Sequence, residues 1–116
     1  MSDKINIIRM RPGEEPEEIC VDNTLEALQR EVGGYIETLR LDREVTAIVN
    51  EEGRLEELTP NCLLRGELIV GPILLCGVAG ESFASMPEGY ASLWLDAMRR
   101  ARERALPLIR EWERGL

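Results

Sequence analysis

The sequence contains no histidine and a single lysine, Lys4, among its 116 residues. The lack of an imidazole excludes Ser-His-Asp triads, Cys-His pairs and histidine-ligated zinc or haem. With one lysine, Schiff-base and phosphate-lysine chemistry are also disfavoured. No apolar run approaches the roughly 20 residues that cross a bilayer, and the first residues lack a signal-peptide pattern. We therefore expect a cytoplasmic location and no membrane partner.

Cysteine is scarce and shows no pairing pattern. Cys20, Cys62 and Cys76 are odd in number and far apart, which fits neither a disulfide framework nor a C-x-x-C zinc site. Each lies in or beside an apolar stretch. We expect small buried side chains in a reducing compartment; a reactive thiol is the alternative, although no lysine or histidine is close in sequence to lower its pKa.

The composition is that of a globular domain, but its charge is uneven. At 44% hydrophobic and 31% charged, the chain fits one folded domain. Residues 1–98 carry 8 basic and 19 acidic side chains, whereas residues 99–116 carry 6 arginines and 3 glutamates. The acidic body repels nucleic-acid phosphates. We expect the terminal arginines to pair with acidic groups of this chain or of a second copy, rather than with nucleic acid.

Local patterns predict the first elements. Alternating apolar residues and a Pro-Gly turn indicate a hairpin over residues 4–22. Asn23 is in position to cap a helix, with apolar residues on one face, that ends at Gly33. Two strands, over residues 35–41 and 45–50, follow.

The second half contains the longest apolar stretch and a long helix. Gly71-Pro72 interrupts the stretch over residues 67–78, which predicts two short strands, an edge strand or a bulged strand. A helix is expected from about Ser85, capped by that side chain, with a kink or break at Pro107.

The element order β-β-α-β-β, a short turn, β and a long α predicts an α+β fold. It matches a small β-grasp-like (ubiquitin-like) mixed sheet with one packed helix and an added C-terminal helix. A different small α+β sheet with the same order is the alternative. We expect one domain, with the sheet and first helix in residues 1–84 and the helical extension in residues 85–116.

Three stretches carry a family resemblance. They are DNTLEALQREVGGYIE (Asp22–Glu37), VNEEGRLEELTPN (Val49–Asn61) and IVGPILLCG (Ile69–Gly77). The chain resembles a small domain-of-unknown-function family from phages, mobile elements and Firmicutes, over roughly residues 5–99. The arginine-rich residues 100–116 depart from that pattern. The resemblance transfers no functional residue; it implies a small, cytoplasmic accessory protein that acts on host defence or regulation by binding.

The string Gly33-Gly34-Tyr35 is the most distinctive candidate for ligand binding. Two glycines at a helix-to-strand junction allow a ligand or a partner backbone to approach closely, with Tyr35 as a stacking platform. The amides of Asn50 and Asn61 are further candidate ligand contacts. The structural alternative, which we favour, is a helix stop followed by a half-buried tyrosine, a solvated turn, and an asparagine that bonds its own backbone.

No arrangement typical of catalysis or metal binding is present. The sequence lacks G-x-S-x-G, G-x-x-x-x-G-K and G-x-G-x-x-G motifs. The turn Asn50-Glu51-Glu52-Gly53 offers oxygen ligands but does not match the twelve-residue calcium loop. We expect no catalytic residues, no metal and no cofactor.

The terminal helix carries an apolar stripe that includes both tryptophans. Its first part, near Trp94, is expected to pack on the sheet. Beyond Pro107 the helix is expected to outrun the sheet, because twenty-odd helical residues span about 30 Å. Leu108, Ile109 and Trp112 then require a partner surface, and with Trp94 they are the predicted interface of a homo-oligomer.

Together these features predict a non-catalytic binding protein. It would form homo-oligomers and hold a host protein or a small ligand near the helix-to-strand glycines. The alternative is an enzyme or ligand-sequestering protein with a pocket around Tyr35, Asn50 and Asn61, which requires these three side chains to converge. Nucleic-acid binding by the arginine-rich tail is a third hypothesis.

Overall fold

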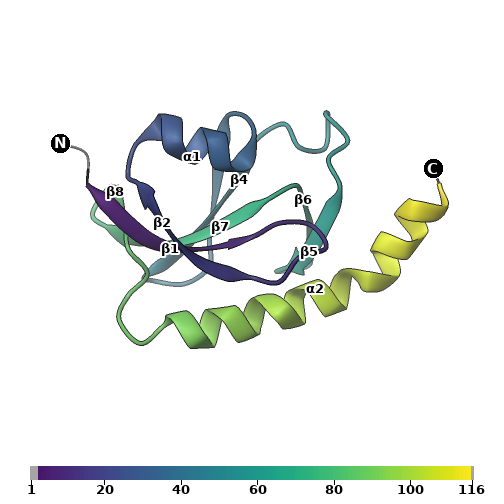
Figure 1. Ribbon diagram of the computed structural model, residues 1–116. Helices are drawn as coiled ribbons and strands as arrows, with labels where there is room; N and C mark the ends of the chain where they lie inside the picture. The colour runs from purple at the N-terminus through teal and green to yellow at the C-terminus, as the bar shows by residue number, and fades with distance from the viewer. Residues whose placement is uncertain (1–2, 116) are drawn as a thin grey trace.

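A six-stranded antiparallel sheet forms the centre of the computed structural model, which describes residues 3–115 (Figure 1). Its strands are β1 (Lys4–Met10), β2 (Glu17–Asp22), β3 (Ile36–Arg40), β4 (Val45–Asn50), β7 (Ile73–Ala79) and β8 (Ser82–Ala84). The strand order is β2-β1-β7-β4-β3, and β8 pairs with β7. Residues 1, 2 and 116, at the ends of the two predicted ranges, lie outside the described residues.

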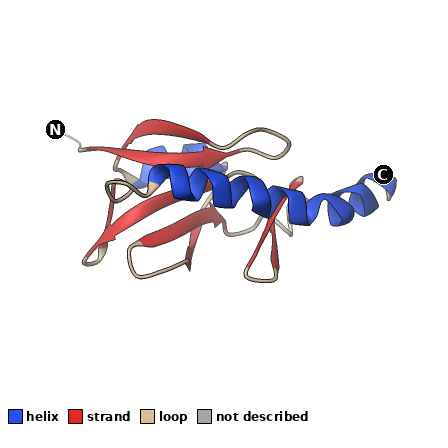
Figure 2. Ribbon diagram, turned by 90° about the horizontal axis from the view of Figure 1, so that it is seen from below, coloured by secondary structure: helices blue, strands red, loops and turns tan. Residues whose placement is uncertain are grey.

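Two helices and a hairpin cover this sheet. They are α1 (Leu25–Val32), α2 (Ala91–Arg114), and a separate two-stranded sheet of β5 (Pro60–Leu64) and β6 (Glu67–Val70). Helix α1 lies on one face of the sheet, and α2 runs along the opposite face, as Figures 1 and 2 show. Helix α2 packs mainly against β5 and also reaches β1.

The core has two halves because the central strands are buried on both faces. Ile7 and Leu74 point to the α1 side, where they meet Leu28 of the helix. Ile8 and Leu75 point to the α2 side. Successive strand residues face opposite sides, so burial of both sides requires a continuous apolar run such as that of β7.

Both ends of α1 follow from local chemistry. The Thr24 hydroxyl accepts a hydrogen bond from the Ala27 amide at 3.1 Å and caps the helix. The predicted cap, Asn23, instead donates its side-chain amide to the Phe83 carbonyl at 2.9 Å. Gly33 ends the helix at a φ of 81°, as expected, because glycine adopts this left-handed conformation without strain.

Helix α2 begins later than predicted. It starts at Ala91, and the Ser85 hydroxyl accepts a hydrogen bond from the Asn6 amide at 2.9 Å instead of capping the helix. The helix continues through Pro107 to Arg114 without a break. Figure 1 shows its last turns, drawn in yellow, bending away from the direction of the first turns.

The predicted α+β class with a long C-terminal helix is confirmed. The finer prediction of a β-grasp is not confirmed: a β-grasp contains a parallel pair of strands, whereas every strand pairing in this sheet is antiparallel. The bend at Gly71-Pro72 does separate two strands, β6 and β7, with Gly71 at a φ of 77°. Strands β5 and β8 were not predicted.

The close approach of β8 to β7 requires glycine at position 77. A Cβ atom on Gly77 would lie 2.2 Å from the backbone oxygen of Ser85. Gly77→Ala should therefore lower the free energy of unfolding in urea by about 1–3 kcal/mol through overpacking. The control Gly115→Ala, whose Cβ would lie 3.4 Å from its nearest neighbour, should change it by less than about 0.5 kcal/mol. Equal stabilities of the two variants would contradict a steric requirement for glycine at position 77.

Candidate functional site

Asn50 joins the end of α1 to the turn after β4. Its side-chain amide donates to the Val32 carbonyl at 3.2 Å, and its oxygen accepts from the Glu52 amide at 2.7 Å. A Cβ on Gly34 would lie 2.9 Å from the Asn50 nitrogen, so the glycine makes room for this contact. The second glycine of the predicted motif therefore serves packing.

Asn61 is completely buried and holds two backbone segments together. Its Nδ2 donates to the carbonyls of Met10 and Gly71, each at 2.9 Å. Its Oδ1 is buried and has no hydrogen-bond partner among the described residues. The bend at Gly71 leaves a carbonyl that no strand pairs, and Asn61 satisfies it, as buried polar groups require.

The predicted pocket around three side chains does not form. Tyr35 is 66% exposed and lines a small cleft of about 240 Å³ with Gly34, Gln29, Glu52 and Glu56. Asn50 lines a different cleft, and Asn61 is fully buried. Tyr35 was also expected to be half buried, and this was wrong, because its ring projects from the junction between α1 and β3.

The residues predicted to form a homo-oligomer interface lie in different surroundings. Trp94 packs against the core of its own chain. Trp112 is half-buried and lines a cleft of about 760 Å³ with Leu58 and other residues around β5 and β6, so this chain itself supplies a surface beyond Pro107. Ile109 is half-buried and Leu108 is 43% exposed. Self-association through α2 stays a prediction.

Three arginines of α2, Arg99, Arg100 and Arg102, pair with acidic groups of the same chain, one of the two expected outcomes. Arg99 and Arg102 form ion pairs with Glu15, at 3.4 and 3.6 Å, on the tip between β1 and β2. Arg104 donates to the Leu63 carbonyl of β5 at 3.2 Å. These contacts hold α2 against the sheet. They also occupy arginines that were candidates for binding nucleic acid.

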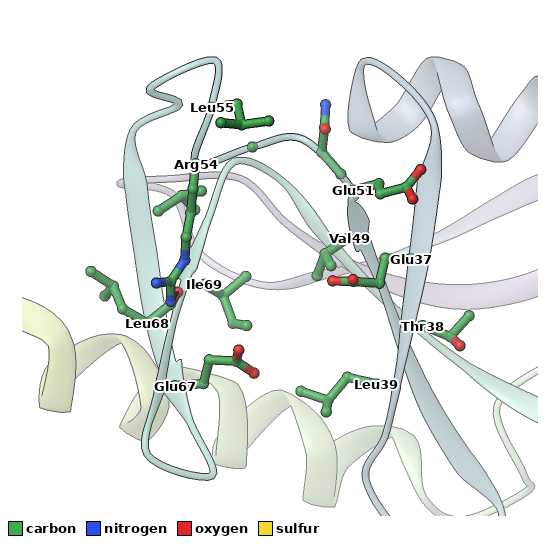
Figure 3. Close-up of a pocket in the computed structure, with 13 residues that line it drawn as sticks. Glu37, Thr38, Leu39, Val49, Glu51, Arg54, Leu55, Glu67, Leu68 and Ile69 are labelled. Atoms are coloured by element: carbon green, nitrogen blue, oxygen red, sulfur yellow. Dashed lines mark hydrogen bonds between the residues drawn. The ribbon is translucent and has the colours of Figure 1, made fainter.

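A further candidate site is a cleft beside β3, with a volume of about 540 Å³ (Figure 3). Strands β3 and β4 form one wall and β6 forms the other. Helix α2 packs mainly on β5, and none of its residues lines this cleft. The floor is apolar and consists of Leu39, Val49 and Ile69. The volume lies within the range of roughly 300–1,000 Å³ that is usual for ligand sites.

Three carboxylates surround this cleft. The side chains of Glu37, Glu51 and Glu67 line it and form no hydrogen bond or ion pair with the described residues. The single cation in its lining, Arg54, donates to the Leu68 carbonyl at 3.0 Å. Figure 3 shows Glu37 and Glu67 directed into the opening from opposite walls. The cleft therefore has a negative rim over an apolar floor.

The arrangement is suited to a cation that also has an apolar part. Within residues 3–115, no three His, Cys, Asp or Glu side chains lie close enough together to hold a metal ion. An organic cation, such as a lysine or arginine side chain, contacts separated carboxylates with its charge and an apolar floor with its methylenes. This is the chemistry that the cleft offers.

Sequence reasoning missed this cleft because it missed the hairpin that walls it. Arg65 and Gly66 both have positive φ, 51° and 74°, the geometry of a two-residue hairpin turn. The signal was the pair Arg65-Gly66 between the apolar runs of residues 60–64 and 67–70. Pro60 does not argue against this hairpin, because proline is tolerated at the first position of a strand.

Comparison with known proteins identifies the family. A family model described as a domain of unknown function (DUF3846) matches residues 5–99. The chain belongs to DUF3846. No curated protein and no solved structure matches it. Residues 3–115 of this DUF3846 protein include no helix that is both long and apolar enough to span a bilayer.

Asn61 should be a stability residue in this DUF3846 protein. Asn61→Ala removes the buried side-chain amide that donates to the carbonyls of Met10 and Gly71, and should lower the free energy of unfolding by about 2–3 kcal/mol. Asn6→Ala, which truncates an exposed asparagine of β1, should change it by less than about 0.5 kcal/mol. Urea titration followed by circular dichroism measures both. Near-equal midpoints would refute the structural role.

The cysteines should differ sharply in reactivity. Burial raises the pKa of the Cys62 and Cys76 thiols to about 12, so both stay protonated and unreactive at pH 8. Cys20 is exposed on the edge strand β2, contrary to the expectation that all three are buried. With a thiol-disulfide reagent at pH 8, one thiol should react quickly and two only after unfolding, and Cys20→Ser should abolish the fast phase. Two fast thiols in the folded protein would contradict the assignment.

Proposed function

We propose that the protein is a non-catalytic binding protein whose cleft beside β3 receives a cationic segment of another protein. The observation that carries the proposal is the set of three carboxylates, Glu37, Glu51 and Glu67, that line this cleft without a partner among the described residues. Carboxylates at a binding surface favour cationic partners and accelerate their association. Apolar residues on the floor add contact area.

The nature of the lining supports binding rather than catalysis. It contains carboxylates, one arginine anchored to a backbone carbonyl, the polar residues Thr38 and Asn50, and aliphatic side chains. The two buried thiols, Cys62 and Cys76, are held protonated and lie outside the cleft. The alternative of an enzyme or sequestering protein at Tyr35, Asn50 and Asn61 is disfavoured, because these side chains do not share a pocket.

The biological setting belongs to the same proposal. The resemblance of the three sequence motifs implies a cytoplasmic accessory protein of a phage or mobile element that modulates host defence or regulation. A host protein with an exposed basic segment is then the partner that the charge of the cleft favours.

The proposal predicts charge-selective peptide binding. A capped, fluorescent heptapeptide of alternating arginine and valine should bind the protein, with an affinity that falls as salt is raised. The double variant Glu37→Gln/Glu67→Gln should bind about three- to tenfold more weakly, since each exposed ion pair contributes up to about 1 kcal/mol. Fluorescence anisotropy at two salt concentrations measures both effects.

Two controls make this test specific. Glu18→Gln removes an exposed carboxylate from β2, remote from the cleft, and should leave the affinity within about twofold. A heptapeptide of alternating glutamate and valine should bind at least tenfold more weakly than its arginine counterpart. Equal affinity of the two peptides, or equal effects of the cleft and control variants, would reject the proposed function.

A further inference from the structure

The cleft adjoins an open strand edge. Strand β3 is last in the order β2-β1-β7-β4-β3, so only one of its edges is paired within residues 3–115. The Glu51 amide donates to the Tyr35 carbonyl at 2.8 Å, and the Leu41 amide donates to the Val45 carbonyl at 3.0 Å. Both bonds join an odd-numbered residue of the segment 35–41 to the segment that contains β4.

Alternation along the strand then fixes the direction of the other backbone groups. In an antiparallel pair, every second residue bonds the neighbouring strand and the residues between point outward. The register of β3 on β4 is continuous from Ile36 to Arg40. The N–H and C=O groups of Ile36, Thr38 and Arg40 therefore face the open edge.

The cleft includes this edge as well as one sheet face. Three consecutive residues, Glu37, Thr38 and Leu39, line it. Successive side chains in a strand point to opposite faces, and in Figure 3 Thr38 is directed away from the opening that Glu37 and Leu39 border. A cleft that contacts all three residues must therefore extend around the outer edge of β3.

We infer that the cleft receives an extended peptide segment with arginine or lysine at alternate positions, which adds to the edge of β3 as a further strand. This inference rests on the proposed function and specifies its ligand. The peptide backbone pairs with Ile36, Thr38 and Arg40. Its alternate side chains face Glu37 and Glu67 across the apolar floor.

Charge selects a basic peptide over a second copy of this chain. The protein carries a formal net charge of −8, and pairing of two β3 edges would bring two copies of the acidic rim together. Charged residues on an exposed edge commonly prevent such self-pairing. A basic strand meets the same edge with opposite charge, so the feature that opposes self-pairing favours this partner.

Backbone pairing distinguishes an extended peptide from a small organic cation as the ligand of this cleft. A small amine satisfies the carboxylates of the rim but leaves the row of outward N–H and C=O groups in water. Strand addition uses both, with main-chain bonds for affinity and side-chain contacts for specificity.

Amide hydrogen exchange on the full chain tests the inference. On saturation with the alternating arginine-valine peptide, the amides of Ile36, Thr38 and Arg40 should exchange at least tenfold more slowly. The amides of Glu37 and Leu39, already bonded to β4, should change much less. Two-dimensional NMR of the uniformly nitrogen-labelled protein resolves this alternation, which binding through side chains alone would not produce.

A matched pair of variants gives a second readout. Thr38→Pro removes an outward N–H but no bond to β4, and should weaken peptide binding at least tenfold, whereas Thr38→Ala should change it by less than about twofold. Protection of the β4 amides confirms that Thr38→Pro is folded; if it is not, the exchange pattern of the unaltered protein decides alone.

The outcomes separate the two proposals. Alternating protection together with loss of binding in Thr38→Pro supports strand addition. Binding that depends on Glu37 and Glu67 without protection of the outward β3 amides overturns strand addition and leaves the proposed function intact. No binding of the arginine-valine peptide above its glutamate counterpart overturns both.

Discussion

The structure depends on burial of the central sheet on both of its faces. Strand β7 shows the constraint most directly, because Leu74 packs under α1 while Leu75 packs on the α2 side. Such a strand is stable only if each face is covered. Helix α1 covers one face over a short length, whereas α2 and the β5–β6 hairpin share the other. The cleft lies at the end of the second face that the helix does not reach.

The distribution of charge follows from the same arrangement. Helix α2 is held against the sheet by arginines, and two of them bind Glu15 on the tip of the first hairpin. These arginines are thereby paired with acidic groups on the side of the molecule that carries α2. The carboxylates near β3 and β6, Glu37 and Glu67 among them, have no such counterpart in the described chain. Unpaired carboxylates therefore lie beside the outer edge of β3.

The features that could be predicted from the sequence are those that depend on residues close together in the chain. The helix end at Gly33 and the bend before Pro72 were predictable because each depends on the backbone preferences of one or two residues. Ser85 was misread as a helix cap because its hydroxyl meets the backbone of Asn6, far away in the chain. Asn61 resembles a turn residue, yet it binds a carbonyl 51 positions away. The cleft was not predictable, since its walls come from strands that only the tertiary fold places opposite each other.

The order of the elements along the chain has a consequence for biosynthesis. Every strand of the sheet leaves the ribosome before α2, which follows all of them in the described chain. Until that helix is translated, only the β5–β6 hairpin covers the apolar face that carries Ile8, Met10 and Leu75. Emergent surfaces of this kind attract chaperones and promote aggregation. Synthesis of α2, rather than formation of the sheet, is therefore the step that completes the cover of this apolar face and lowers the tendency to aggregate.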